Sequence, residues 1–190
     1  CNCNDGEEHS AMYIWMFGIG GCVIIGRTWE EFISLMRTVS DTFGTGKDDL
    51  RLICGVHNLS FEFQYLRGIY QFKPEEVFAI ESRKVLKCEM LDHFEYRCSY
   101  LQTNMSLDEF LKKMGVEDLK QSGDEFNYKK IRYPWTRLSD QEMKYIINDV
   151  KGLVEALEIE LRHDEKNLYN VPRTSTGYVR EDVKRAMRSF

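Results

Sequence analysis

The chain has 190 residues, of which 43% are hydrophobic and 30% are charged, a composition typical of a single globular domain. Its 26 basic and 31 acidic side chains give a formal net charge of -5. That balance argues against a general nucleic-acid coat protein, which would be basic, but it does not exclude a nuclease, whose active site must itself be acidic to hold cations. No apolar run approaches the length of a membrane span, so we expect a soluble protein without a membrane partner.

Six cysteines and four histidines restrict the metal chemistry that is open to the chain. No Cys-x-x-Cys pair is present, which argues against a zinc site. Four cysteines lie among strand-like apolar residues, and we expect them to be buried free thiols in a reducing cytoplasm: Cys22, Cys54, Cys88 and Cys98. The chain opens at Cys1 with neither an initiator Met nor a signal peptide, which indicates a native beginning further upstream.

The first part of the chain predicts a hairpin, a helix, a strand and a second helix. Apolar runs joined by glycines are typical of a hairpin. Thr28 followed by Glu31 predicts a capping box at the start of the first helix. The expected elements are strands at 12–17 and 22–25, a helix over 27–43, a buried strand at 51–56 and a helix over 60–70.

The rest of the chain predicts short strands followed by helices. Ser139, with Glu142 three residues later, predicts a second capping box, at the start of the longest helix. The expected elements are a meander of strands at 75–101, a helix at 106–115, an irregular segment at 116–137, a long helix at 139–164 and a last helix within 176–190. This order predicts an α/β domain with a mixed sheet.

The stretch "VHNLSFEFQYL" places one carboxylate, Glu62, between Phe61 and Phe63. Two interpretations of this residue are open from the pattern alone. Glu62 is either a helix residue that faces water or a metal ligand that needs partners from elsewhere in the chain.

Tyr145 and Asp149 lie four residues apart on the long helix, and therefore on one face. Gly152 and Ala156 follow along the same edge, and such small residues allow a helix to approach a sheet closely. We therefore expect Tyr145 and Asp149 where the helix meets the sheet edge. Taken alone, a tyrosine and an aspartate at this spacing are common on helices that have no function there.

Read together, the two stretches resemble the second and third exonuclease motifs of family B DNA polymerases, particularly the bacteriophage type. The second motif, Asn-x-x-Phe/Tyr followed by an acid, is matched by Asn58, Phe61 and Glu62, and the third, Tyr-x-x-x-Asp, by Tyr145 and Asp149. The resemblance covers nearly the whole chain. It implies a ribonuclease H-like α/β fold, in which helices flank a mixed central sheet, and a proofreading 3′-5′ exonuclease that acts in DNA replication.

In that family four acids bind two divalent cations, Mg²⁺ or Mn²⁺. The resemblance implies that Glu62, where the family usually has Asp, and Asp149 are metal ligands, and that Tyr145 and Lys120 support catalysis. The family's first motif, Asp-x-Glu on the first strand, is not found. Either residues 2–4, Asn-Cys-Asn, replace its acids, or the strand that carries it lies upstream. We therefore expect the fold to lack its first strand and the chain to be inactive as given.

Single-stranded DNA with a primer terminus is the implied partner of the site. Basic and aromatic residues interleave between 120 and 137, which suits a strand whose phosphates are neutralised and whose bases stack. A solvated loop with its aromatic residues turned inward is the alternative. The implied DNA contacts are Asn58, Phe61, Ser99, Tyr100, Leu101, Tyr128, Lys129, Lys130 and Arg132.

The resemblance also divides the chain. Residues 1–173 correspond to the exonuclease domain, and 174–190 correspond to a connector helix that leads to the polymerase domain of the same native chain. The implied setting is the cytoplasm of a bacterial cell infected by a phage, or another virus-encoded protein. Two alternatives stay open: a free-standing exonuclease of the same group, and a catalytically inactive nucleic-acid-binding domain.

Overall fold

The computed structural model describes residues 11–47, 50–91, 93–116, 126–127 and 129–188. Its strands are β1 (Trp15–Ile19), β2 (Cys22–Gly26), β3 (Leu52–Val56), β4 (Val77–Ala79), β5 (Val85–Met90) and β6 (Phe94–Cys98). Its helices are α1 (Trp29–Phe43), α2 (Leu59–Leu66), α3 (Ser99–Thr103), α4 (Leu107–Met114), α5 (Asp140–His163) and α6 (Ser175–Arg188), with a short 3-10 turn η1 (Pro74–Glu76). Among these described helices, none combines the length and the apolar character needed to cross a membrane.

The strands form two separate sheets. β1 and β2 are an antiparallel hairpin, whose turn residues Gly20 and Gly21 take positive φ angles that other residues rarely adopt. The larger sheet has the order β3-β6-β5-β4, with β3 parallel to β6 and the other neighbours antiparallel. The expectation of a mixed sheet in an α/β protein is therefore confirmed.

One face of the larger sheet is apolar and the other is charged, because side chains alternate along β5 and β6. The apolar face is formed by the cross-strand pairs Cys88–Tyr96 and Met90–Phe94. Met36 of α1 and Leu59 of α2 are fully buried in the same core cluster, and the Tyr96 hydroxyl lies 3.2 Å from the Met36 sulfur. The charged face carries Lys87, Glu89, Glu95 and Arg97.

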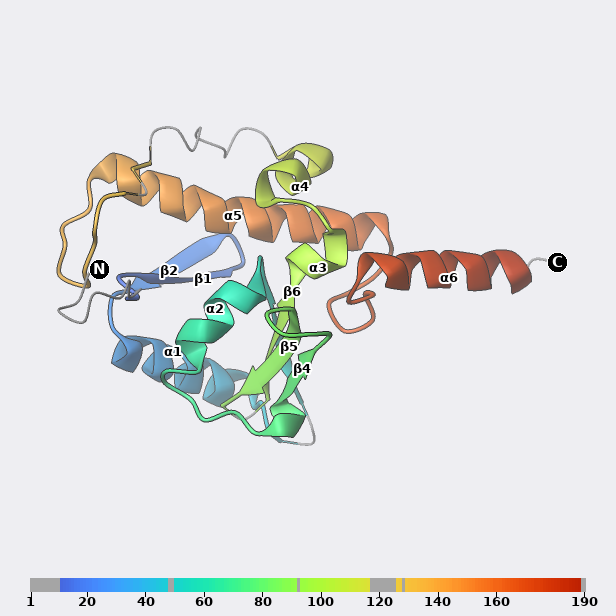
Figure 1. Cartoon of the computed structure of the whole chain (residues 1–190), viewed down its shortest axis with the longest axis horizontal. Coiled ribbons are helices and arrows are strands. Elements are labelled where there is room, and N and C mark those ends of the chain that lie inside the picture. Colours follow the sequence, from blue (N-terminus) through green and yellow to red (C-terminus); the bar gives the residue numbers. More distant parts are fainter. Residues whose placement is uncertain (1–10, 48–49, 92, 117–125, 128, 189–190) are drawn as a thin grey trace.

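α5 is the longest helix and contacts both sheets (Figure 1). Glycines on the strands allow the close approach: a Cβ atom on Gly18 of β1 would lie 2.8 Å from methyl groups of Val150 and Val154, and one on Gly55 of β3 would lie 2.6 Å from Leu157 Cδ1. The prediction that Gly152 and Ala156 serve this purpose is wrong. A Cβ atom on Gly152 would lie 3.1 Å from Leu111 Cδ1 of α4, and Ala156 is fully buried in the α4–α5 cluster.

Two further expectations are corrected. Residues 99–103 form the helix α3 and not a strand, and Asn104 ends it in the left-handed conformation. Cys22 is exposed at the first position of β2, because that side of the hairpin strand faces outward. Cys54, Cys88 and Cys98 are free thiols that are buried or half-buried, and burial raises the pKa of Cys54 and of Cys88 to about 12.

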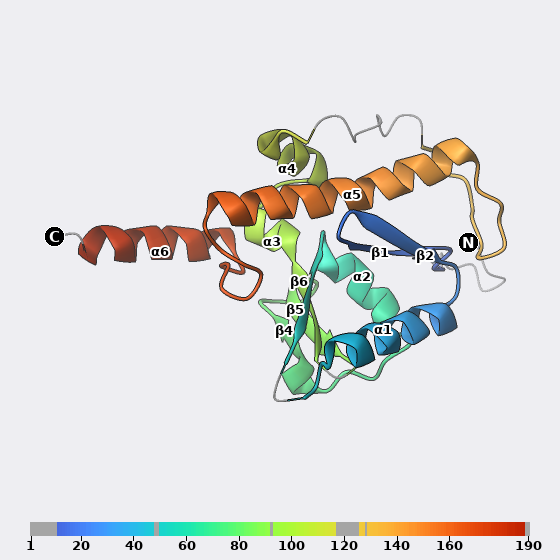
Figure 2. The same cartoon turned by 180° about the vertical axis from the view of Figure 1, so that it is seen from behind.

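α6 projects from the body of the molecule beyond the end of α5, as both views show (Figures 1 and 2). None of its described residues is buried. Its apolar side chains are among the most exposed of the chain, with exposed fractions of 62% for Val179, 52% for Val183 and 73% for Met187.

Candidate functional site

Glu62 lies in the first turn of α2, directly after the carboxyl end of β3. Asn58 is the N-cap residue, with a left-handed φ of 63°, and its side chain makes no capping hydrogen bond. The next residue, Leu59, is fully buried and anchors the start of the helix in the core. The Glu62 side chain itself is exposed, yet the surrounding protein displaces enough water to raise the pKa of its carboxyl group. Phe61, 56% exposed, lies edge-on to Tyr65 with ring centroids 5.4 Å apart.

The start of α3 lies against the end of β3. Ser99 Oγ is 3.0 Å from His57 Nδ1, and the Tyr100 ring meets the His57 ring edge-on at 5.8 Å. Burial lowers the pKa of His57, so this imidazole is neutral near pH 7. Of the three predicted DNA contacts here, Ser99 is 2% exposed and Leu101 is half-buried against the core, whereas Tyr100 is 40% exposed. Tyr100 is therefore the most exposed of the three side chains.

The Tyr145 ring stacks on Phe126, with centroids 4.8 Å apart and planes 22° apart. Asp149 follows one turn later on α5 and is half-buried. Glu160 lies three turns further along the same flank, and its carboxylate accepts a hydrogen bond of 2.8 Å from Gln102 Nε2 of α3. Because α3 also meets His57, this flank of α5 and the start of α2 are joined through one short helix. The convergence of Glu62 and Asp149 on a shared site stays a prediction.

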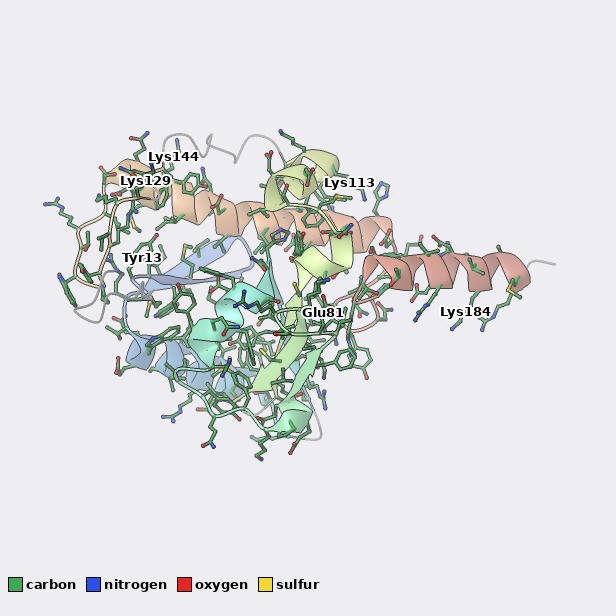
Figure 3. The ribbon with its side chains drawn as sticks, in the orientation of Figure 1. Tyr13, Glu81, Lys113, Lys129, Lys144 and Lys184 are labelled. Carbon is green, nitrogen blue, oxygen red and sulfur yellow. The ribbon has the colours of Figure 1, made fainter. Side chains whose placement is uncertain are left out.

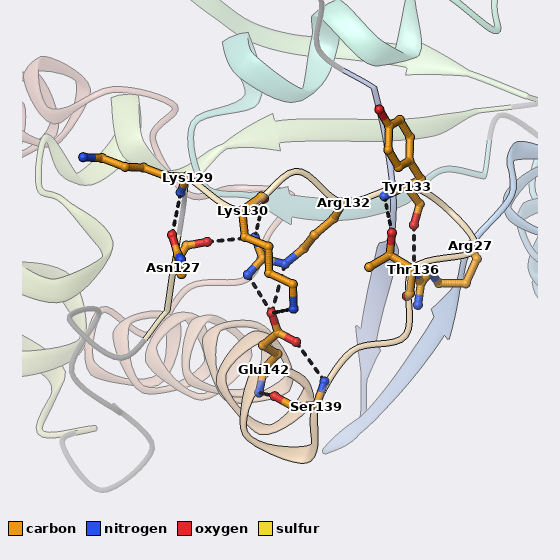
Figure 4. Close-up of polar contacts among 9 residues, drawn as sticks. All are labelled: Arg27, Asn127, Lys129, Lys130, Arg132, Tyr133, Thr136, Ser139 and Glu142. Carbon is orange, nitrogen blue, oxygen red and sulfur yellow. Dashed lines mark hydrogen bonds and ion pairs between the residues drawn. The ribbon is translucent and has the colours of Figure 1, made fainter. Parts of the chain in front are cut away.

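Arg132 organises the segment that enters α5 (Figure 4). Its side chain is 4% exposed, and its Nη2 lies 2.7 Å from Glu142 Oε1. Its Nη1 donates to the carbonyl oxygens of Asn127 and Lys130, both at 2.9 Å. The guanidinium also lies over the Phe126 ring, 4.3 Å from its centroid. The structure thus gives Arg132 an internal role that engages its charge with protein groups, and its DNA contact stays a prediction.

Glu142 receives three kinds of donor at the amino end of α5. Lys130 Nζ lies 2.8 Å away, the Ser139 backbone N–H donates over 2.8 Å, and Arg132 completes the set. Together the Lys130 and Ser139 bonds and the Arg132 bond lower the pKa of Glu142 to about 2. A small cavity of about 250 Å³ opens beside this carboxylate, lined partly by Phe126 and Tyr145. The loop, the cavity and the candidate catalytic tyrosine therefore share one corner of the molecule.

Among the described residues of this loop, the alternative of inward-turned aromatic residues holds for Phe126, which is 7% exposed, but not for Trp135. Trp135 is 80% exposed and Ile131 is 60% exposed, while Tyr133 is half-buried. Lys129 is exposed, and its backbone N–H donates to Asn127 Oδ1 over 3.0 Å. Lys120 and Tyr128, which the resemblance implies for catalysis and DNA binding, lie outside the described residues.

The motif analysis missed a second polar cavity, of about 470 Å³, where α3, α4, α5 and α6 meet. Gln102, Glu160 and Tyr178 line it, and Gln102 bonds to both of the others. Burial, followed by the charge of Asp164, raises the pKa of Glu160, and burial raises that of Tyr178. Glu160 gave the available signal in the sequence, because it lies between Leu157 and Leu161 on the apolar side of α5.

Within the described part of the chain, no three His, Cys, Asp or Glu side chains gather closely enough to hold a metal ion. Glu62 and Asp149 offer the oxygen ligands that hard divalent cations prefer, but two carboxylates are an incomplete set. Comparisons of the chain with protein-family models, curated proteins and solved structures found no match. The class that the geometry defines is a mixed α/β protein, with two candidate acids at helix positions and a basic, aromatic loop at the start of α5.

Proposed function

We propose that this chain is the 3′-5′ exonuclease domain of a bacteriophage-type family B DNA polymerase, with a ribonuclease H-like fold. The observation that carries the proposal is the way in which α5 bridges two sheets that are not hydrogen-bonded to each other. The motif matches at Asn58, Phe61 and Glu62, and at Tyr145 and Asp149, supply the chemistry.

The spacing between the sheets supports a further strand between them, outside the described residues. Along α5 the contact with Gly18 falls at Val150 and Val154 and the contact with Gly55 falls at Leu157. These positions are about 5–10 Å apart along the helix axis at about 1.5 Å per residue. Neighbouring strands lie about 4.8 Å apart. Among the described residues β1 and β3 do not pair, and their contacts on α5 lie up to about two strand spacings apart along the helix, which would leave room for one strand between them.

A strand in that position would run between the elements that carry the two candidate acids. Glu62 begins α2 at the carboxyl end of β3, which is the end of a strand where α/β proteins usually bind ligands. Asp149 immediately precedes Val150, the α5 residue that contacts β1. In the ribonuclease H-like arrangement the added strand would bring the Asp-x-Glu acids to the same place.

Mg²⁺ or Mn²⁺ ions held by such a set of carboxylates would activate water and stabilise charge on the attacking and leaving oxygens. The residues of this chain would supply the rest. The stacking of Tyr145 on Phe126 restrains its ring and would orient its hydroxyl toward the attacking water. The exposed side chains of Asn58, Phe61 and Tyr100 would hold the 3′ end of single-stranded DNA. Lys120 and Tyr128 keep their supporting roles in the proposal.

α6 fits the role of a connector toward the polymerase domain of the same native chain. Its exposed apolar side chains at Val179, Val183 and Met187 would be covered on that domain. Hydrogen exchange compares the two states. We expect fast exchange through 179–188 in the isolated chain and slow exchange in the full-length protein, whereas strong protection in the isolated chain would contradict docking.

The test of the proposal is hydrolysis by the native full-length protein with Mg²⁺ or Mn²⁺. We expect release of 3′-terminal nucleotides from single-stranded DNA, and little hydrolysis by the present chain alone. Asp149→Ala and Glu62→Ala should each abolish release while the protein remains folded. Glu158→Ala, an exposed acid on the same helix, is the matched control. Undiminished release by Asp149→Ala would overturn the proposal, and DNA binding without any hydrolysis would favour the inactive binding domain.

A further inference from the structure

Tyr133, Pro134, Trp135 and Thr136 form a tight turn that the rest of the protein holds in place. The Thr136 backbone N–H donates to the Tyr133 carbonyl over 2.9 Å, and Thr136 Oγ1 accepts from the Tyr133 N–H over 2.8 Å. Pro134 occupies the second position of the turn, where its fixed φ is favoured. Arg27 Nη2 then donates to the carbonyl oxygens of Tyr133 and Thr136, at 3.0 and 2.8 Å (Figure 4). The turn is therefore preorganised before any partner arrives.

The turn presents a stacked aromatic pair to solvent. The rings of Tyr133 and Trp135 are 5.1 Å apart between centroids, with planes only 4° apart. Trp135 is 80% exposed, whereas Trp15 is 8% exposed and Trp29 is half-buried in edge-on contact with Phe32. A tryptophan is among the costliest side chains to leave in water, and its exposed ring face can still accept a further flat group.

The same loop is positively charged. Residues 126–139 include Lys129, Lys130, Arg132 and Arg137 and no acid, in a chain whose net charge is -5. Lys130 and Arg132 are paired with Glu142. Lys129 and Arg137 are exposed, and in the described structure neither forms an ion pair. Lys129 and Lys144 both lie at the end of the molecule where α5 begins (Figure 3).

We infer that Tyr133 and Trp135 form a base-stacking platform for an unpaired DNA strand, with Lys129 and Arg137 placed to neutralise its phosphates. The identity of the strand as DNA rests on the proposed function. Every base has a flat face that stacks on an aromatic ring, but only unpaired bases expose that face, which selects a single strand over a duplex. Preorganisation of the turn lowers the entropy that binding would otherwise cost. The platform would hold the strand outside the hydrolytic site and feed it past Tyr145.

The test measures binding of labelled oligothymidylate by fluorescence anisotropy, in EDTA to prevent hydrolysis. Trp135→Ala should weaken binding about tenfold, because removal of one stacked aromatic ring commonly costs about 1–3 kcal/mol per base. The affinity of Trp135→Ala should keep the salt dependence of the wild type, because the variant loses no Lys or Arg side chain. Tyr169→Ala, which removes a ring that is 77% exposed elsewhere on the surface, is the matched control and should leave affinity unchanged.

An abasic strand of the same length separates stacking from charge. Trp135→Ala and wild type should bind the abasic strand equally, because that strand has no bases to stack on Trp135. Lys129→Gln should weaken binding to both strands and should lower the slope of log affinity against log salt by about 0.7, the value for one phosphate contact on a single strand. Equal binding of oligothymidylate by Trp135→Ala and wild type would overturn the inference. An equal loss of affinity for oligothymidylate and for the abasic strand would also overturn it. If wild type sediments as a dimer and Trp135→Ala as a monomer, Trp135 contacts a second copy of the chain and the inference is again overturned.

Failure of this inference is distinguishable from failure of the proposed function. Hydrolysis that depends on Asp149, together with normal oligothymidylate binding by Trp135→Ala, would retain the exonuclease and remove the platform. Base-dependent binding through Trp135 without hydrolysis by the full-length protein would retain the platform and remove the exonuclease.

Discussion

Two arginine–glutamate pairs in this molecule have the same chemistry and different consequences. Arg97 Nε lies 2.5 Å from Glu95 Oε1 on the charged face of the large sheet, and Arg132 Nη2 lies 2.7 Å from Glu142 Oε1 at the start of α5. In both pairs the arginine side chain is almost fully buried, at 7% and 4% exposed. In both, the guanidinium also donates to backbone carbonyl oxygens of an irregular segment.

The pair on the sheet is enclosed. Glu95 is 1% exposed and also lies 3.3 Å from both Lys87 Nζ and Arg51 Nη1. Burial alone would raise the pKa of Glu95, but the hydrogen bond and charge of Arg97 and the charge of Lys87 outweigh burial and lower it. Arg97 reaches the Leu168 carbonyl and so holds the segment before α6 against the sheet.

The pair at the helix start is at the edge of the molecule. Glu142 is 12% exposed and is fixed by the cap of α5, and Arg132 draws a loop onto it. That loop carries the exposed Trp135. The difference shows that a buried ion pair inside a sheet face mainly secures the fold. The pair on the sheet ties an irregular segment to an enclosed face, whereas the pair at the helix start orders a loop whose Trp135 side chain stays exposed.

The largest effect is expected at the enclosed pair. Glu95→Ala should destabilise the protein by about 3–5 kcal/mol, because it leaves the buried Arg97 charge without its carboxylate. Urea denaturation measures the change, and Arg51→Gln, which removes a half-exposed cation from the same carboxylate, is the control with an expected loss below about 1 kcal/mol. Equal losses for the two variants would show that the enclosure of Glu95 has no energetic consequence.

Arg132→Ala should cost about 2–3 kcal/mol, less than Glu95→Ala, because Glu142 keeps Lys130 and Ser139 and can take up water. The loop should lose order, which limited proteolysis between 126 and 139 would detect as faster cleavage. Arg132→Lys should not restore protection, because one ammonium group cannot reach the carboxylate and two carbonyl groups together. If Arg132→Ala is cleaved at the wild-type rate, the order of the loop does not depend on the Arg132–Glu142 pair.

Glu142→Gln should destabilise the protein by about 1–2 kcal/mol at pH 7, allowing for the water that reaches the pair. The folded-state pKa of about 2 lies below the ordinary 4.5, so ionisation of Glu142 stabilises the fold above pH 4.5. That contribution is lost as the pH falls from 4.5 toward 2. Thermal unfolding of the two proteins should therefore differ at pH 7 and converge in acid, and a difference independent of pH would exclude ionisation as its source.

Lys130→Gln should have the smallest effect, below about 0.5 kcal/mol, although its Nζ is as close to Glu142 as the Arg132 nitrogens are. Its side chain is 42% exposed, so water and salt screen the pair. Added salt should remove the difference from wild type while leaving the Arg132→Ala loss in place. A loss for Lys130→Gln that matches the Arg132→Ala loss would remove the contrast between buried and exposed cations.

The sequence alone was sufficient for features that a few neighbouring residues determine. The capping boxes at Thr28–Glu31 and Ser139–Glu142 mark helix starts as predicted, because each depends on hydrogen bonds within about one turn. The strands β1, β2 and β3 lie in the apolar runs expected to form them, although β1 begins at Trp15 and not at residue 12. The motifs at Asn58–Glu62 and Tyr145–Asp149 were visible because each spans only a few neighbouring residues.

Packing across the chain decided the rest. Sequence spacing suggested that the small residues of α5 face the sheet, but Gly152 faces α4, and Gly18 and Gly55 of the strands make room for the helix instead. The outward stack of Trp135 on Tyr133 depends on Arg27, more than a hundred positions earlier in the chain. Local hydrogen bonds are encoded by adjacent residues, whereas the orientation of a face or a loop depends on which distant side chains fill the space beside it.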